Sequence, residues 1–310
     1  MNNNNKQNTL YDVIIIGAGP AGMSAALTLG RAMINALVVN EASPRNLVTQ
    51  ASHGFLTQDG VHPTEIMRVA IEQLQAYDSV VYCQATVTAV AAVPQGFEVT
   101  YDSGESAIAK RIIFATGFKD DLARVNMNGL AEVYGKSVYP CPFCDGWELK
   151  GQPLAIFAAA NNILDFTKVI THWAKDVVVF SHGQPIPQVA QQVLNQKNIP
   201  WYDHPVKHLL ADEGILHTVV LMNGEAIPRV GGFIDNPGEV LSTELPVALG
   251  VKLSNYGAYD ANFVGETAVS GVYIIGDAKT GFSGVAGVVA EGNVVGQSIV
   301  YDIMDEQWYQ

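Results

Sequence analysis

The sequence predicts an α/β protein with two domains, each built around a parallel sheet that lies between layers of helices. A strand–helix–strand pattern occupies residues 11–40, a second occupies residues 154–180, and a glycine-rich turn follows the first strand of the first pattern. Alternating strands and helices are typical of layered α/β folds. The chain has 310 residues, a length that suits two domains, and 48% of them are hydrophobic, which supplies buried cores.

The first strand–helix–strand pattern predicts a dinucleotide-binding unit of the Rossmann type. DVIIIG, residues 12–17, predicts a buried strand, an alanine-rich helix follows, and NALVVN, residues 35–40, predicts the second strand. Gly17, Gly19 and Gly22 form G-x-G-x-x-G between the strand and the helix, the context that makes this motif specific. The first glycine permits a tight turn, the second lets the backbone approach a pyrophosphate, and the third lets helix and strand pack closely. The helix N-terminus adds positive potential toward the phosphates.

The acid that holds the ribose of such a cofactor is expected at the end of the second strand. That position is Asn40, and Glu41 follows it. Asn40 can hydrogen-bond a ribose hydroxyl without a charge, and Glu41 is the alternative partner. The sequence leaves both open.

The other predicted elements follow from the same patterns. Proline is favoured in the first turn of a helix, so Pro63 marks a helix start. The last helix consists largely of small residues, which let it lie close to a flat ligand or a sheet, with plain packing as the alternative. In order, these elements are a helix within residues 59–77, strands within 80–93, 96–101 and 109–118, a second strand–helix–strand unit at 154–157, 163–173 and 176–180, a strand within 215–224, and a strand at 272–277 followed by the small-residue helix.

Charge and hydropathy exclude several classes of partner. The formal net charge is -13, which argues against nucleic acid or an anionic membrane surface as the main partner. No apolar run approaches the roughly 18 residues that span a bilayer. The start of the chain, MNNNNKQNTL, is polar and lacks the apolar core of a signal peptide. We therefore expect a cytoplasmic protein that binds neither nucleic acid nor membrane.

The chain has three cysteines, and two of them form a C-x-x-C pair. A structural zinc site needs four ligands, and no second C-x-x-C follows Cys141 and Cys144, so we predict a redox pair and no metal. Cys83 lies in a predicted strand and is expected to be an inert buried thiol. Asp145 directly follows the pair and is expected to move protons to and from the thiols. Its alternative role is the N-cap of the following turn.

Four motifs in order along the chain resemble the low-molecular-weight thioredoxin reductase family of flavoproteins: GAGPAG at 17–22, ATG at 115–117, CPFCDG at 141–146 and GVYIIGD at 271–277. The resemblance covers almost the whole chain. It implies a discontinuous FAD domain of residues 1–117 and 241–310. A second, pyridine-nucleotide-type domain, residues 118–240, would be inserted between them and carry the cysteine pair. It also implies a homodimer, with Cys144 facing the flavin and Cys141 exchanging with the substrate.

The same resemblance implies a set of FAD contacts. Gly17, Gly19, Pro20 and Ala21 would hold the pyrophosphate, and Gly276 and Asp277 the ribityl chain, while Val285 and Ala286 would lie close to the flavin ring. The predicted cofactor-binding set is completed by Asn40, Glu41, Asn46, Val87, Thr116 and Gly117.

Further motifs resemble one branch of this family. They are PRN at 44–46, HG at 53–54, DGVHPTE at 59–65 and CPFCDGWE at 141–148. This branch includes fungal and bacterial dithiol oxidases, which close disulfides in small molecules, and pyridine-nucleotide-independent thioredoxin reductases share part of the pattern.

The second strand–helix–strand unit lacks the usual NADPH motif. Residues 158–163 read AAANNI where the family has a glycine-rich turn, so no glycine remains for a pyrophosphate. The next strand ends in Ser181-His182-Gly183 instead of arginines, and no arginine lies between Arg124 and Arg229. Because backbone donors and guanidinium groups carry phosphate recognition, we expect that NADPH is not bound in the usual way. Weak binding of NADH remains the alternative.

Together these observations predict an FAD-dependent dithiol/disulfide oxidoreductase. As a reductase, it would take electrons from a donor such as ferredoxin and reduce a thioredoxin-like protein or a small disulfide. As an oxidase, it would take electrons from a small-molecule dithiol and pass them to oxygen. A flavin-bearing sensor with little turnover is a third alternative, which the intact C-x-x-C with its aspartate disfavours.

Overall fold

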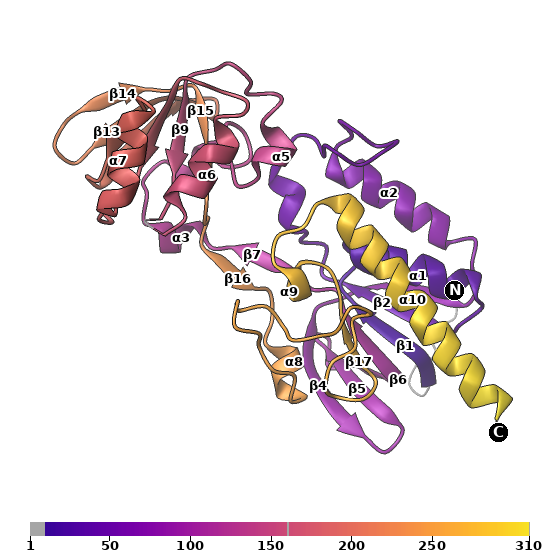
Figure 1. Cartoon of the computed structure of the whole chain (residues 1–310). Coiled ribbons are helices and arrows are strands. Elements are labelled where there is room, and N and C mark those ends of the chain that lie inside the picture. The colour runs from indigo at the N-terminus through magenta and orange to yellow at the C-terminus, as the bar shows by residue number, and fades with distance from the viewer. Residues whose placement is uncertain (1–9, 160, 310) are drawn as a thin grey trace. The chain divides into compact units, whose positions relative to one another are not determined.

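The computed structural model describes residues 10–159 and 161–309, and these residues divide into two compact units (Figure 1). The first unit comprises the described part of Met1–Leu47 with Phe55–Lys119 and Leu241–Gln310. The second comprises Val48–Gly54 and the described part of Asp120–Val240. Each unit holds a largely parallel sheet with helices, so the predicted α/β fold with two Rossmann-like sheets is confirmed.

The first unit, as far as the structure describes it, contains a seven-stranded sheet in the order β3-β2-β1-β6-β5-β4, with β17 also paired to β6. β1, β2, β3, β6 and β17 run parallel, whereas β4 and β5 are antiparallel to their neighbours. Ile14 pairs in register with Leu37 and Ile112, and all three are buried. The strands are β1 (Leu10–Ile16), β2 (Ala36–Asn40), β3 (Val80–Gln84), β4 (Val87–Val93), β5 (Gly96–Tyr101), β6 (Ser106–Phe114) and β17 (Val272–Ile274).

The helices of this unit explain the small residues near the C-terminus. α10 lies alongside α1 (Figure 1). A Cβ added to Gly292 would lie 2.1 Å from the carbonyl oxygen of Ala21, so only glycine allows this approach. The small residues of α10 therefore let it lie close to another helix, and its apolar side chains join the same core cluster as strand residues. The helices are α1 (Pro20–Arg31), α2 (Pro63–Leu74) and α10 (Val285–Trp308), with short turns η1 (Arg45–Val48), α8 (Leu245–Ala248) and α9 (Asp277–Thr280).

The second unit contains a five-stranded parallel sheet in the order β11-β10-β9-β15-β8, in the part of the chain that the structure describes. A separate antiparallel sheet of three strands follows in the same unit. The strands are β8 (Val138–Tyr139), β9 (Leu154–Phe157), β10 (Val177–Phe180), β11 (Trp201–Tyr202), β12 (Val206–Asp212), β13 (Ile215–Leu221), β14 (Ala226–Pro228) and β15 (Gly231–Ile234), and the helices are α3 (Leu122–Val125), α4 (Leu130–Val133), α5 (Pro142–Asp145), α6 (Ile163–Ile170) and α7 (Gln188–Gln196). β7 (Phe118–Asp120) and β16 (Glu239–Leu241), where the chain passes between units, pair with each other.

Several local predictions differ from the structure. The strand predicted over 80–93 is two strands, because the chain turns after β3 and resumes in β4. The helix predicted over 163–173 ends at Ile170, since Trp173 donates to the carbonyl of Ile170 and closes a tighter turn. Cys83 is half-buried, not buried, because β3 is the edge strand of its sheet.

One segment of the N-terminal part belongs to the second unit, whereas the predicted division placed it in the first. Val48–Gly54 packs there, and a Cβ added to Gly135 would lie 2.7 Å from the carbonyl oxygen of Val48. Among the described residues no helix is both long and apolar enough to cross a bilayer.

Candidate active site

The two cysteines predicted to be redox-active form a disulfide within the second unit. Their Cα atoms lie 5.3 Å apart. Cys141 is the N-cap of α5, and Pro142 occupies the first helical position, where its missing N–H costs nothing. The amide of Cys144 donates a hydrogen bond to the Sγ of Cys141 over 3.1 Å. One helical turn therefore brings the two sulfurs together, with Cys141 buried and Cys144 half-buried.

Asp145 is a buried carboxyl at the end of this turn. Its side chain is 8% exposed. Burial, and then the charge of Glu148, raise the pKa of Asp145 to about 7. Asp145 is the last residue of α5, and Cys141 is the N-cap of this helix. A carboxyl with this pKa is partly protonated at neutral pH and can both give and take a proton beside the disulfide.

Charged and aromatic side chains surround this turn. Glu148 lies 3.6 Å from the Nε2 of His53, which the segment Val48–Gly54 carries. Phe143, between the cysteines, is 79% exposed, and its ring lies edge-to-face with that of Trp173, with 5.5 Å between the ring centres. Trp147 is 66% exposed and lies beneath the ammonium group of Lys150. The surroundings of the disulfide within this unit are thus both apolar and charged.

In the first unit, the three glycines of G-x-G-x-x-G are present for different reasons. Gly17 has a φ of +101°, and a Cβ there would lie 2.4 Å from the carbonyl oxygen of Ala115. A Cβ on Gly22 would lie 2.0 Å from the carbonyl oxygen of Gly17. Gly19 has an extended backbone, and a Cβ there would meet nothing within 4 Å. The fold therefore requires Gly17 and Gly22 but not Gly19, and open space beside Gly19 suits the close approach of a pyrophosphate.

Residues after β6 provide a second indication of a ligand. The Oγ1 of Thr116 is buried and has no hydrogen-bond partner among the described residues. A buried polar group without a partner is costly and calls for one. Gly117 next to it has a φ of +62°, and a Cβ there would meet no atom within 4 Å. Both residues follow the carboxyl end of a parallel strand, where ligands of such sheets bind, so the residues present fit a bound FAD.

The two candidate ribose contacts already have protein partners. The Nδ2 of Asn40 donates to the hydroxyl of Tyr82 over 2.7 Å. Glu41 pairs with the ammonium group of Lys119 over 3.1 Å. Asn40 ends β2 and Glu41 follows it, as the pattern predicts.

The predicted ribityl and ring contacts lie at the junction of β17, α9 and α10. Gly276 has a φ of +69°, and its amide donates to Oε2 of Glu291 over 2.8 Å. Val285 and Ala286 are the first two residues of α10 and are half-buried and exposed, respectively. Glycine at 276 is therefore required by a left-handed backbone in which its amide has a fixed partner.

Asp277 belongs to a polar cluster that sequence patterns did not predict. Its Oδ1 accepts from the amide of Ser283 over 3.0 Å, and its Oδ2 lies 3.8 Å from Nη1 of Arg45. The Arg45 guanidinium also lies 5.2 Å from the centre of the Phe282 ring. Asn46 follows in the same turn, η1, and Val87 begins β4 opposite Tyr101. Arg45 was part of the PRN motif, yet the motif alone assigned it no contact.

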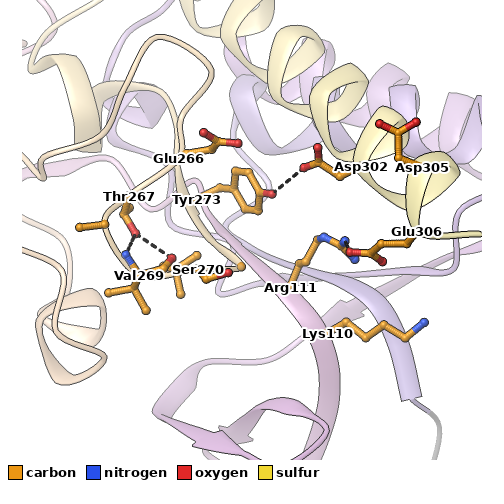
Figure 2. Close-up of a pocket in the computed structure, with 13 residues that line it drawn as sticks. Lys110, Arg111, Glu266, Thr267, Val269, Ser270, Tyr273, Asp302, Asp305 and Glu306 are labelled. Atoms are coloured by element: carbon orange, nitrogen blue, oxygen red, sulfur yellow. Dashed lines mark hydrogen bonds and ion pairs between the residues drawn. The ribbon is translucent and has the colours of Figure 1, made fainter. Parts of the chain in front are cut away.

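A surface pocket of about 680 Å³ lies elsewhere in the first unit, between the end of α10 and the loop at residues 266–273 (Figure 2). It contains none of the predicted site residues. Several of its polar groups already have protein partners: Tyr273 donates to Asp302 over 3.2 Å, Arg111 pairs with Glu306, and Lys110 pairs with Asp12. We therefore do not assign the active site to this pocket.

Comparisons with known proteins agree with this arrangement. A family model for pyridine nucleotide-disulphide oxidoreductases matches residues 11–292. The chain belongs to this family. A protein of Arthroderma benhamiae assigned as a thioredoxin reductase is 30% identical over 302 residues, which cover 87% of this chain and 74% of that protein. Thioredoxin reductase sirT of Leptosphaeria maculans is 27% identical, covering 96% of this chain and 95% of that protein.

A solved structure from Bacillus anthracis, assigned as the thioredoxin reductase TrxB, superposes with a TM-score of 0.92 at 34% identity. The match covers 96% of this chain and 99% of that chain. Together with the disulfide at Cys141 and Cys144, these similarities make the chain a thioredoxin reductase-like, FAD-dependent oxidoreductase.

In this thioredoxin reductase-like chain, replacing Asp145 by asparagine is expected to stabilise the protein more at high pH than at low pH. The pKa of Asp145 is raised from 3.8 to about 7 in the folded protein. The folded state thus binds the proton more tightly, so wild-type stability falls as the pH rises from 3.8 to 7. Asp145→Asn does not lose stability in this way. The difference between its free energy of unfolding and that of the wild type is therefore expected to grow by about 2 kcal/mol between pH 5.5 and pH 8.

Urea unfolding of both proteins at the two pH values measures this difference. An equal advantage at both values would mean that Asp145 ionises in the folded protein as it does in the unfolded chain.

Proposed function

We propose that this chain is an FAD-dependent dithiol/disulfide oxidoreductase whose second unit does not accept NADPH in the usual way. Electrons would reach the Cys141–Cys144 disulfide from another donor, such as ferredoxin, and pass to a thioredoxin-like protein or a small disulfide. The observation that carries this proposal is an acidic contact at the start of α6, where a pyridine nucleotide would place its pyrophosphate.

This contact joins Asn162, the residue before α6, to Asp235, which follows β15. The Nδ2 of Asn162 donates to Oδ1 of Asp235 over 2.6 Å. Burial raises the pKa of Asp235, the hydrogen bond from Asn162 lowers it, and the charge of Glu239 raises it. β15 is the neighbour of β9 in the sheet, so the carboxyl lies beside the turn that leads from β9 into α6. Acidic groups at this position disfavour a phosphate, because charges of like sign repel at short range.

The end of β10 offers no cation for a 2′-phosphate. Residues 181–187, which read SHGQPIP, contain neither arginine nor lysine. The ring of His182 already has two backbone partners: Nδ1 accepts from the amide of Val206 over 3.0 Å, and Nε2 lies 3.2 Å from the carbonyl oxygen of Val125. Ser181 donates its hydroxyl to the carbonyl of Gln184. These contacts support the loss of 2′-phosphate recognition in this unit.

The first unit offers the groups that would hold FAD. Gly19 and Gly117 leave room beside the backbone. The buried hydroxyl of Thr116 has no hydrogen-bond partner among the described residues and could bond to the cofactor. Gly17 directly follows β1 and Gly276 lies shortly after β17, Pro20 and Ala21 begin α1, and Asp277 begins α9. When bound, FAD would supply or accept an electron pair.

The cysteine pair performs the exchange with the substrate. Reduction of the disulfide consumes two electrons and two protons and yields two thiols, and oxidation returns them. Asp145 is the group that would give and take a proton at the sulfurs, since it is buried beside the pair and partly protonated near neutral pH. By the family resemblance, Cys144 would exchange with the flavin and Cys141 with the substrate.

The relatives named as thioredoxin reductases support a thioredoxin-like partner. By the same family resemblance, we also propose a homodimer that works in the cytoplasm.

Anaerobic titration of the FAD-loaded protein tests the proposal. We expect the visible flavin band to stay oxidised with excess NADPH or NADH and to bleach with dithiothreitol. Rapid bleaching by NADPH would overturn the loss of the nucleotide site. A band that stays oxidised with dithiothreitol would overturn the exchange between the cysteines and the flavin.

The direction of the reaction is then measured with the same protein. Bleaching by reduced ferredoxin, followed by reduction of a thioredoxin disulfide, is the expected result. Oxygen consumption that depends on an added dithiol, with no transfer from ferredoxin, would identify a dithiol oxidase instead.

A further inference from the structure

We propose that Glu148 and His53 act as a charge pair that sets the protonation of Asp145. Glu148 would keep the Asp145 carboxyl protonated, and a protonated His53 would cancel that effect by neutralising Glu148. Both are positioning residues that act through Asp145, and the inference rests on the proton role given to Asp145 in the proposed function.

The geometry places these groups together within the second unit. Glu148 is three residues after Asp145, in the turns that follow α5, and its Oε1 lies 3.6 Å from Nε2 of His53. Their side chains are 40% and 22% exposed, so solvent weakens the attraction without removing it. His53 comes from Val48–Gly54, a segment that leaves the first unit and packs here.

The charge of Glu148 acts on the buried groups around the disulfide. Burial is the largest cause of the raised pKa of Asp145, and the charge of Glu148 is the second. The pKa of Tyr139 is raised by burial, by Asp145 and by Glu148, in that order. In this unit the charge of Glu148 thus acts on both Asp145 and Tyr139, and His53 pairs with Glu148. Tyr139 stays neutral near pH 7, because its pKa is about 12. Glu148 is therefore the charge that matters at neutral pH, and His53 is its cation.

The exchange reaction needs a protonated Asp145, and the negative charge of Glu148 favours that form. When a substrate thiolate attacks the disulfide, a mixed disulfide forms, the Cys141–Cys144 bond breaks, and the leaving sulfur takes a proton from Asp145. An ionised Asp145 has no proton to give. Glu148 thus extends proton donation by Asp145 to higher pH.

The test measures how fast dithiothreitol reduces the disulfide in the FAD-loaded protein, with alkylation of the freed thiols and mass spectrometry as the readout. Dividing each variant's rate by the wild-type rate at the same pH removes the ionisation of dithiothreitol itself. At pH 8, Glu148→Gln is expected to be about threefold slower, because a partly exposed charge shifts a neighbour's pKa by about half a unit. The deficit is expected to vanish at pH 5.5.

His53 is tested by a pair of substitutions. His53→Arg carries a permanent positive charge and is expected to be about threefold slower at pH 8 than His53→Gln, which is neutral. The difference is expected to shrink in about 1 M salt, where the Debye length is about 3 Å. Glu225→Gln, the same chemical change in a distant turn of this unit, is the control that keeps the wild-type rate.

Two results would overturn the inference. One is an unchanged rate for Glu148→Gln at pH 8. The other is equal rates for His53→Arg and His53→Gln at pH 8, which would mean that His53 has a structural role only. Asp145→Asn separates this failure from failure of the proposed function. If Asp145→Asn keeps the wild-type rate at pH 5.5, Asp145 moves no proton and the proposed function is wrong at that step. If it is slow at pH 5.5 while the Glu148 and His53 variants match the wild type at pH 8, only the charge pair is wrong.

Discussion

Replacing Cys144 by serine is expected to lower the rate of dithiol/disulfide exchange by about 1,000-fold or more while FAD stays bound. Serine forms no disulfide, so the remaining thiol of Cys141 can no longer store an electron pair with its partner. Cys141→Ser is expected to be as severe, because the exchange needs both sulfurs. The measurement is the steady-state rate with a small dithiol, with flavin content read from the visible absorption of the purified protein.

Cys83→Ser is the matched control for this experiment. Cys83 lies on β3, the edge strand of the first unit's sheet, and it is not part of the disulfide. Its variant is expected to keep the wild-type rate. Exchange by Cys144→Ser within tenfold of the wild type would show that the C-x-x-C pair is not the redox centre.

The two cysteine variants also report which sulfur meets the substrate. Each variant keeps one thiol, and only the thiol that exchanges with substrate can be trapped as a mixed disulfide. By the proposed roles, Cys144→Ser leaves Cys141 able to form this adduct, and Cys141→Ser does not form it. Mass spectrometry after incubation with a small disulfide distinguishes the two, and a trapped adduct on Cys144 would reverse the roles.

Much of the fold was predictable because the signals are local. The β-branched run of β1 and the glycines after it lie within a dozen residues, so one short pattern predicts a strand, a turn and a helix. The disulfide was predictable for the same reason, since its two cysteines share one helical turn. The edge strand β3 was harder to predict, because burial of Cys83 depends on which strands come to lie beside it.

The parts that were missed depend on contacts between distant positions. His53 and Glu148 are far apart along the chain, and no local pattern places the segment Val48–Gly54 against the second unit. The bond from Asn162 to Asp235 likewise joins two loops that meet only when β9 and β15 become neighbours. The loss of glycines at 158–163 was visible in the sequence, whereas the acid beside that turn was not.

The glycines of the first turn differ in whether folding or cofactor binding requires them. Gly22 faces backbone: a Cβ there would lie 2.0 Å from the carbonyl oxygen of Gly17. Gly19 faces open space, and its backbone is one that any residue adopts. The same substitution at the two positions therefore distinguishes a residue that the chain needs in order to fold from one that only a bound cofactor requires.

Gly22→Val is expected to destabilise the protein without its cofactor by about 3 kcal/mol or more, because the clash is with backbone and cannot be relieved by a side-chain rotation. Gly19→Val is expected to cost about 1 kcal/mol, through the weaker N-cap that valine makes. Yet Gly19→Val is expected to lower the affinity for FAD by about 100-fold or more, since it blocks the backbone donors that charge-assisted bonds to a pyrophosphate need. Urea unfolding of the FAD-free proteins and a fluorescence titration with FAD measure the two effects separately.

The contrast between the two variants is what decides the assignment of the cofactor site. A Gly19→Val protein that folds and binds FAD as the wild type does would show that the pyrophosphate lies elsewhere. The roles proposed for Pro20 and Ala21 would then also be wrong. A Gly19→Val protein as unstable as Gly22→Val would show that the space beside Gly19 is not free in the folded chain. Normal stability with lost FAD affinity is the result that requires a ligand at this turn, because among the described residues only Gly19 and its chain neighbours lie within 4 Å of the added Cβ.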